Sequence, residues 1–173
     1  MKKGVLLGAL ASMLLSMTAC TAPSVGSGVI AMVPFSGDDF GIRGVGPAGW
    51  AEVEAGRFAC GSPPTEDAQL LQESFPGSMD ELVPLLLADT NLDALPERGG
   101  TYKDSAFSWD LYTFDTQIEE LGAETYRLRL ALAEGESVSY FVALVVTPDA
   151  YDANAPLPDT VFTHALYSLA PLG

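Results

Sequence analysis

The chain has 173 residues, and its 23 acidic residues outnumber its eight basic ones, which gives a net charge of −15 at pH 7. This length is typical of one domain. A surface this acidic repels phosphate groups, which excludes nucleic acids as partners and disfavours direct attraction to anionic lipid headgroups.

The N-terminal segment has the pattern of an export signal. Lys2 and Lys3 precede an apolar run over residues 5–17, and small residues then lead to Cys20. These features are typical of a cleaved secretory signal peptide and too short for a membrane-spanning helix. The cysteine directly after the cut resembles the bacterial lipobox, with Met17 in a position where leucine is more usual.

The resemblance to the lipobox implies that residues 1–19 are removed as a lipoprotein signal peptide. Cys20 would then carry acyl chains such as palmitate and tie the chain to the extracytoplasmic face of the cell membrane or envelope. The alternative is an ordinary signal peptide with an incidental cysteine. Loss of Lys2 and Lys3 leaves six basic residues against 23 acidic ones, a net charge of about −17.

The mature chain divides into a tether and a domain. Residues 20–28 are rich in Pro, Gly and Ser, a composition typical of a flexible tether. Residues 29–173 contain no second linker and no repeat, so we expect them to form one domain.

Short strands are predicted for the start of this domain. They cover residues 30–35, 41–46, 51–54 and 57–60, the last two flanking a tight turn at Ala55-Gly56. Residues 70–75 are ambiguous between strand and helix. A strand is favoured because Pro76-Gly77 ends the segment after so few residues.

A helix is predicted over residues 79–88. Ser78 and Glu81 have the spacing of a capping box before an apolar run. Pro84 conflicts with this start, because it removes a backbone donor beyond the first helical turn. Either the helix starts later than the box indicates or it bends at Pro84.

The second half alternates more clearly. Residues 107–115 place Trp109 and Leu111 on one face of a strand, with Tyr112 and Phe114 on the other. Residues 126–132 alternate leucine with Arg127 and Arg129, as in a half-buried strand, and residues 138–146 are apolar on both faces, as in a central strand. The final predicted helix carries an apolar stripe, formed by Phe162, Ala165, Leu166 and Leu169.

Together these segments predict an α+β domain, an antiparallel sheet flanked by helices. Residues 39–50 read D-F-G-I-R-G-V-G-P-A-G-W. This segment resembles the opening of PsbP-like domains, where a strand of the type F-G-(apolar) runs into P-x-G-W. The order of the later strands and of the last helix is also similar to that family, over about residues 30–169.

The resemblance implies docking without catalysis. The family includes an extrinsic subunit on the lumenal face of photosystem II and a nuclear-transport regulator that binds a small GTPase, so its members share a fold rather than one duty. Related domains also accompany secreted hydrolases as accessory modules.

The residues with reactive side chains do not form a recognisable catalytic set. Cys60 lies in a predicted strand, where a half-buried structural thiol is the expected state. His164, the only histidine, lies about 200° round the last helix from the start of its apolar stripe, so we expect it to face water. A Cys60–His164 dyad is the alternative, and no residue is evident that would orient the imidazole.

Two oxygen-rich segments and two tryptophans are the remaining candidates for a binding site. Asp89, Asn91 and Asp93 match the opening of a calcium loop, but Ala94 replaces the required glycine. The second segment has no recognised spacing and contains Asp149, Asp152, Asn154 and Asp159. Trp50 and Trp109 fit either a ligand pocket or, more commonly, a core.

We therefore assign no catalytic, cofactor or metal-binding residue from the sequence, and lipidation at Cys20 is the one predicted modification. The expected function is a membrane-anchored, extracytoplasmic lipoprotein that docks an envelope or membrane protein and is not an enzyme. The alternative is a lipoprotein that binds a small ligand or a divalent cation.

Overall fold

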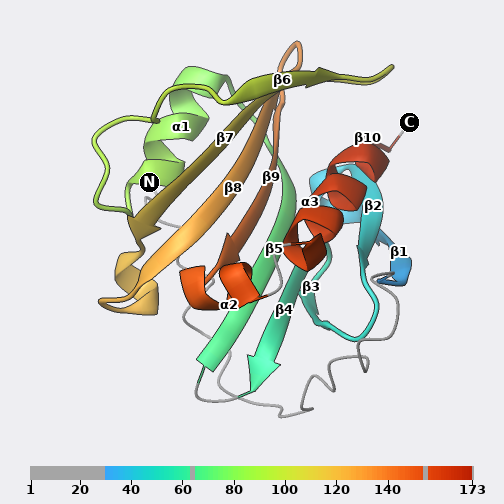
Figure 1. Ribbon diagram of the computed structural model, residues 1–173. Helices are drawn as coiled ribbons and strands as arrows, with labels where there is room; N and C mark the ends of the chain where they lie inside the picture. Colours follow the sequence, from blue (N-terminus) through green and yellow to red (C-terminus); the bar gives the residue numbers. More distant parts are fainter. Residues whose placement is uncertain (1–29, 63–64, 154–155, 173) are drawn as a thin grey trace.

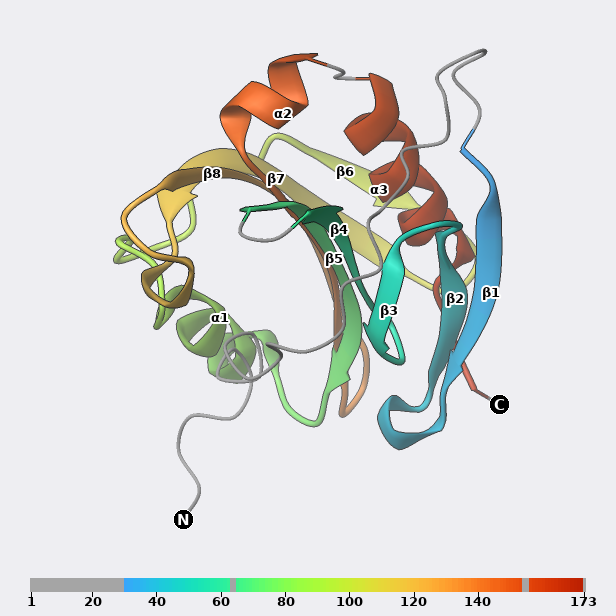
Figure 2. The same cartoon turned by 90° about the horizontal axis from the view of Figure 1, so that it is seen from below.

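The computed structural model describes residues 30–62, 65–153 and 156–172 and arranges them in three layers (Figure 1). A seven-stranded antiparallel sheet is the middle layer. The helix α1 (Met79–Leu87) lies on one side of this curved sheet (Figure 2). The helices α2 (Pro148–Ala153) and α3 (Pro156–Ser168) lie on the other side, together with a smaller sheet.

The larger sheet has the spatial order β3-β4-β5-β9-β8-β7-β6, and all its neighbouring strands are antiparallel. Its strands are β3 (Ala51–Glu54), β4 (Arg57–Ser62), β5 (Thr65–Phe75), β6 (Gly100–Lys103), β7 (Ser108–Gln117), β8 (Thr125–Glu134) and β9 (Ser139–Val146). The strand β9 lies in the middle of this sheet and is covered on both faces, which explains why it is apolar on both faces. The prediction of a central strand over residues 138–146 is therefore confirmed. The segment 70–75, ambiguous from sequence, lies in β5 and is a strand.

The smaller sheet has the order β1-β2-β10 and consists of β1 (Met32–Gly37), β2 (Ile42–Pro47) and β10 (Ala170–Pro171). Gln72 of β5 connects the two sheets, because its Nε2 donates a hydrogen bond to the Val45 carbonyl at 3.0 Å. The C-terminal end of α3 is tied to the same strand, since the Val45 N–H donates to Ser168 Oγ at 3.0 Å. The first two predicted strands are thus confirmed, but they form a separate sheet with β10.

Two apolar cores lie on the two faces of the larger sheet. The core beneath α3 and the smaller sheet includes Trp109, Leu144 and Phe162, whereas the core beneath α1 includes Leu82 and Leu130. Alternate residues of one strand enter different cores, as predicted for β7: Trp109 and Leu111 pack on the α3 side, Tyr112 and Phe114 on the α1 side.

The helix α1 begins where the capping box predicts. Ser78 is its N-cap, and the Ser78 N–H donates a hydrogen bond to Glu81 Oε2 at 3.0 Å. Pro84 lies inside the helix, so the alternative of a later start is wrong. The bonds of the capping box and the burial of Leu82 and Leu87 offset the missing donor at Pro84.

The helix α3 buries all four residues of its predicted stripe, Leu169 following directly after its end. Three short elements were not predicted, namely β6, α2 and β10. Each has a tertiary neighbour: β6 pairs with β7, β10 pairs with β2, and Asp152 of α2 accepts a hydrogen bond from Arg127 of β8. Two short 3₁₀ helices, η1 (Asp38–Phe40) and η2 (Glu119–Leu121), complete the described structure. No helix in the described ranges is long and apolar enough to cross a bilayer.

Candidate functional site

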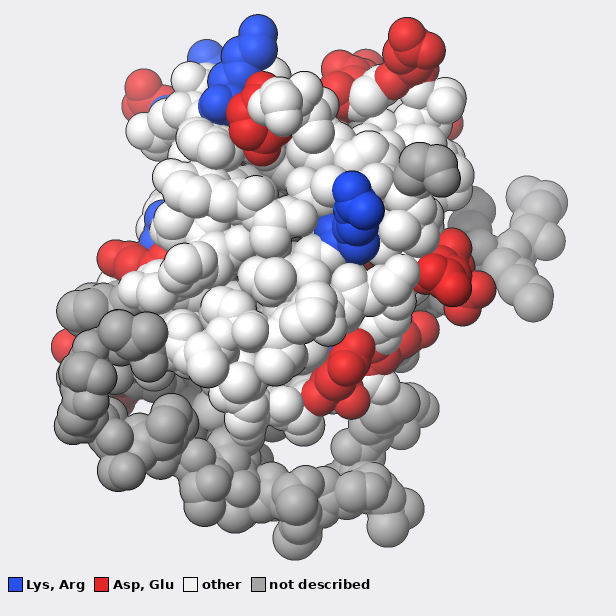
Figure 3. Space-filling view, turned by 90° about the vertical axis from the view of Figure 1, so that its right-hand side faces the viewer, with Lys and Arg blue, Asp and Glu red and all other residues white. Residues whose placement is uncertain are grey.

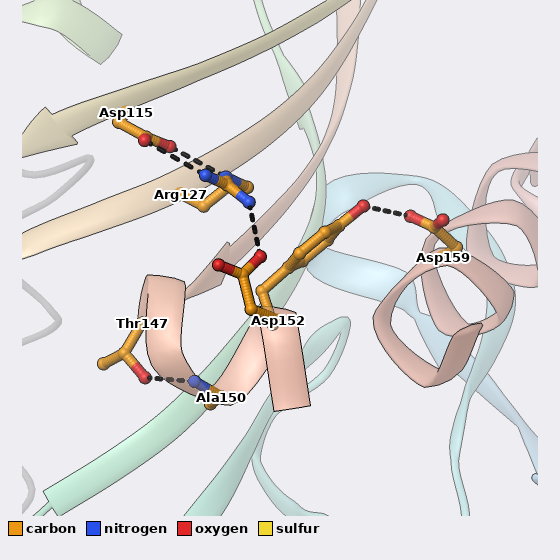
Figure 4. A network of polar contacts seen from close by, with 7 residues as sticks. Asp115, Arg127, Thr147, Ala150, Asp152 and Asp159 are labelled. Atoms are coloured by element: carbon orange, nitrogen blue, oxygen red, sulfur yellow. Dashed lines mark hydrogen bonds and ion pairs between the residues drawn. The ribbon is translucent and has the colours of Figure 1, made fainter. Parts of the chain in front are cut away.

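A network of charged residues joins β8 to α2 and α3 (Figure 4). Arg127 of β8 donates two hydrogen bonds to Asp115 on β7, Nε to Oδ1 at 2.9 Å and Nη2 to Oδ2 at 3.2 Å. Its Nη1 donates to Asp152 of α2 at 3.1 Å. The hydrogen bonds from Arg127 hold the pKa of Asp115 below its ordinary value, although partial burial acts in the opposite direction.

The second arginine of β8 attaches α3. Arg129 is hydrogen-bonded to Asp159 and lies over the Phe162 ring, 4.5 Å from its centroid. Tyr151 of α2 donates its hydroxyl hydrogen to the same carboxylate, Asp159, at 2.7 Å. Burial, followed by this hydrogen bond, raises the pKa of Tyr151. The alternating arginines of the predicted half-buried strand thus lie partly buried beneath two helices, and the network fixes those helices to the sheet.

The two oxygen-rich segments have structural roles. Asn91 Oδ1 accepts hydrogen bonds from Thr116 Oγ1 at 2.7 Å and from the Gln117 N–H at 3.2 Å, which fastens the loop after α1 to β7. Asp152 and Asp159 belong to the network with the arginines of β8. Within the described ranges, no three His, Cys, Asp or Glu side chains are grouped so as to hold a metal ion. Asn154 lies outside the described residues.

The other predicted candidates are placed separately. Cys60 is a half-buried residue of β4, as predicted. His164 is exposed on α3, also as predicted. Trp109 is fully buried in the core, and Trp50 packs partly buried against it, so both tryptophans belong to the core rather than to a pocket. Cys20 lies outside the described residues.

A buried ion pair was not predicted from the sequence. Arg57 of β4 donates a hydrogen bond from Nε to Glu73 Oε1 on β5, and the Glu73 side chain is only 3% exposed. Burial raises the pKa of Glu73, and the hydrogen bond from Arg57 offsets only part of this effect. We assign this pair a structural role, because each of the two buried side chains forms an ion pair with the other.

A groove with a partly apolar lining lies between α1 and one end of β7 and β8. It has a volume of about 590 Å³. Its lining includes four half-buried apolar or aromatic residues, Met79, Val83, Leu95 and Tyr112. Carboxylates from three elements also line it, contributed by Asp80, Asp110 and Glu134.

A second hollow of about 520 Å³ adjoins the first on the side of the loop after α1. The two hollows share Val83, Pro84 and Leu95, so they form one depression along α1. Asp93 lines the second hollow. From here on, the α1 groove means these two hollows together.

Sequence reasoning missed the α1 groove, although one signal was present. Residues 82–87 read L-V-P-L-L-L, which is apolar all round a helix rather than on one face. A helix of this kind has more apolar surface than one core covers. Leu82 and Leu87 are buried, whereas Leu85 remains 39% exposed and Val83 lines the groove.

The opposite side of the molecule has a second notable surface, formed by α3 and the smaller sheet. Charged side chains lie mostly around its margin (Figure 3). Tyr167 of α3 is 57% exposed there and stacks on Tyr102 of β6 at a centroid distance of 4.5 Å.

Two solved structures share this architecture. The solution structure of cyanobacterial PsbP (CyanoP) from Synechocystis matches 87% of this chain and 98% of its own length, with 12% sequence identity and a TM-score of 0.51. The Ran-binding protein Mog1p of Saccharomyces cerevisiae matches 83% of this chain and 97% of its own length, with 10% identity and a TM-score of 0.51.

No protein-family model matches the chain, and no curated protein matches its sequence with significance. Sequences this different show a common fold and nothing beyond it. The predicted fold class is therefore confirmed: the domain has the α+β fold shared by CyanoP and Mog1p.

Proposed function

We propose that this chain is a lipid-anchored, extracytoplasmic module that docks a partner protein at a membrane or cell envelope and catalyses no reaction. The observation that carries the proposal is the α1 groove, where apolar side chains remain accessible between carboxylates. Contiguous accessible apolar surface with a polar rim is characteristic of interaction sites.

A role without catalysis is supported by the state of the reactive groups. His164 is exposed and makes no hydrogen bond to a nucleophile or a carboxylate within the described ranges. Among the described residues, the two carboxylates with a shifted pKa are paired with arginine: Glu73 with Arg57, and Asp115 with Arg127. A general base needs access to a substrate proton, and these pairs leave neither carboxylate free for that task.

The anchor is supported by the sequence around Cys20. The predicted tether covers only residues 20–28, so the linkage between a lipidated Cys20 and the domain would be short. A short tether would hold the domain close to the bilayer, where a membrane or envelope partner is at a high effective concentration.

Site-specific photo-crosslinking tests the docking function. A photoreactive amino acid is placed in the full-length chain at Leu95 in the groove, at Tyr167 on α3, or at Glu124 in an exposed loop. Docking predicts an adduct of constant mass from one of the two surface features, and none from Glu124. If neither the Leu95 variant nor the Tyr167 variant forms an adduct, in cells that retain the chain at normal levels, the proposal is contradicted.

The groove volume favours a second candidate, a small-ligand lipoprotein. A volume of about 590 Å³ is within the range of small-molecule pockets. Thermal-shift screening of the full-length chain measures this directly. A compound that stabilises the wild type but not the Val83→Asn variant would support this candidate. For the cation alternative, the measurement is calorimetry with calcium, and heat of binding would support it. Their absence, together with a protein adduct at Leu95, would dismiss both.

A further inference from the structure

We infer that the α1 groove binds a basic segment of the partner, in which aliphatic side chains alternate with arginine or lysine. This inference rests on the proposed docking function and names the site and the class of partner. Its basis is the juxtaposition of an apolar floor with two carboxylates, Asp80 and Glu134, that form no ion pair with another described residue.

The charge distribution supplies the first argument. The chain carries 23 acidic residues against eight basic ones. In the described part of the chain, four arginines are already used in ion pairs: Arg57, Arg98, Arg127 and Arg129. No ion pair of Asp80, Asp93 or Glu134 is present among the described residues. The groove therefore carries negative charge at Asp80 and Glu134 that no described arginine or lysine pairs with, and an external cation could do so.

The position of these carboxylates supplies the second argument. Asp80 lies in the first turn of α1, and Glu134 lies at the end of β8, on different elements that line the same hollow. Asp110 is the third carboxylate of the groove, and its Oδ1 accepts a hydrogen bond from Arg98 Nη1 at 2.8 Å. Basic side chains that enter between Asp80 and Glu134 could pair with both carboxylates. The bound segment would cover the groove and exclude water, which would strengthen these ion pairs.

The apolar lining supplies the third argument, and it selects the kind of cation. Val83, Leu95 and Tyr112 offer surface that a metal ion or a small polyamine would leave uncovered. Arginine and lysine have long aliphatic stems that lie on apolar surface while their charged ends reach carboxylates. Leucine or valine beside them would fill the remaining space, so an amphipathic basic segment matches both features of the groove.

Charge argues against the other occupants of this groove. A second copy of the chain would bring a net charge of the same sign, and anionic lipid headgroups would meet the same repulsion. A neutral or acidic peptide would leave Asp80 and Glu134 without a partner while removing water from them, which is unfavourable.

Fluorescence anisotropy with designed peptides tests the inference. The probe is a labelled peptide of arginine and leucine, compared with a version in which glutamate replaces arginine and one in which serine replaces leucine. We expect the full-length chain, in non-ionic detergent at about 0.15 M salt, to bind the first peptide at least about tenfold more tightly than either of the others.

Two matched pairs of variants localise the binding. Asp80→Asn with Glu134→Gln is expected to weaken binding about tenfold, and Glu52→Gln with Glu124→Gln, an equal change of charge on exposed residues elsewhere, less than about twofold. Val83→Ser is expected to weaken it about fivefold, and Leu85→Ser, on the same helix but outside both hollows, to have no effect. Glu134→Gln alone leaves α1 unchanged and gives the same direction of effect if the first pair folds poorly.

The outcomes separate this inference from the docking function. Peptide taken up by detergent would give the same signal for every variant, so the difference between variants is decisive. Equal binding of the serine peptide, equal weakening by the two charge pairs, or no binding of any peptide would overturn the groove assignment. In that event an adduct at Tyr167 would still support docking through the other face, whereas no adduct at either position would overturn docking itself.

Discussion

Gly46 of β2 lies directly against the ring of Phe58 of β4, where a methyl group on Gly46 would stand 2.1 Å from Phe58 Cζ. This contact joins the smaller sheet to the larger one. We expect Gly46→Ala to lower the free energy of unfolding by about 1–3 kcal/mol, because an added carbon in a packed core forces its neighbours to move. Urea denaturation measures the change.

Gly100→Ala is the control for this prediction, since a methyl group there meets no atom within 4 Å. We expect it to change the free energy of unfolding by less than about 0.5 kcal/mol. If the two variants lose equal free energy of unfolding, the close packing of Gly46 against Phe58 does not contribute to stability as expected.

Asp115 is expected to contribute stability that depends on pH. The hydrogen bonds from Arg127 lower its pKa in the folded chain below the ordinary value of 3.8. A group with a lowered folded pKa stabilises the fold above its unfolded pKa, and this contribution is lost as the pH falls through the folded pKa.

The stability difference between wild type and Asp115→Asn should therefore be constant above about pH 5 and shrink as the pH falls below about 4. Thermal unfolding across this range measures it. Glu124→Gln, at an exposed loop position away from this pair, should show no such trend. A difference that grows on acidification would contradict the role of the pair with Arg127.

Arg57→Met is expected to destabilise the fold strongly, because it leaves Glu73 buried without its partner. Both side chains are largely buried, and removing one member of a buried pair typically costs about 3–5 kcal/mol. Burial raises the pKa of Glu73 and Arg57 partly offsets this, so removing Arg57 should raise the pKa further. The loss should therefore be smaller near pH 4, where protonation of Glu73 is favoured, than at pH 8, where its burial as a charged group is most unfavourable.

The double variant Arg57→Met with Glu73→Leu is the control for this prediction. It removes both charges, so it should recover most of the lost stability and abolish the pH dependence of the loss. A single variant whose loss is the same at both pH values would show that Glu73 is not the cause.

Cys20→Ala is expected to release the chain from the membrane fraction, because the proposed anchor would depend on acylation of that thiol. Mass spectrometry of the mature wild-type N-terminus should show a lipid-modified Cys20. Cys60→Ala is the control, since this half-buried residue of β4 has no part in the anchor, and it should remain in the membrane fraction. An unmodified soluble product from the wild type would contradict the anchor.

Much of the fold was predictable because its main elements carry local signals. The capping box at Ser78 and Glu81, the alternation along β7 and β8 and the stripe on α3 each reflect one period of a regular element and one buried face. The elements missed were short ones, β6, α2 and β10, whose few residues show no clear period.

The role of the arginines on β8 could not be predicted from their alternation. Alternation shows that Arg127 and Arg129 share a face, but it does not show whether water or helices cover that face. Asp152 and Asp159 reach them from the far end of the chain, and only the packing of α2 and α3 brings them within hydrogen-bonding distance.

The sequence by itself determined the α+β class and the strong excess of negative charge, because each is a property of composition or of a short period. The export signal before Cys20 stays a prediction. Only the tertiary structure decided that β1 and β2 leave the main sheet and that Asp80 and Glu134 line one groove. The strand β2 pairs with β10 from the far end of the chain, and the position of β8 between β7 and β9 in the larger sheet brings Glu134 to α1. Such long-range pairing depends on the whole core, and no local pattern records it.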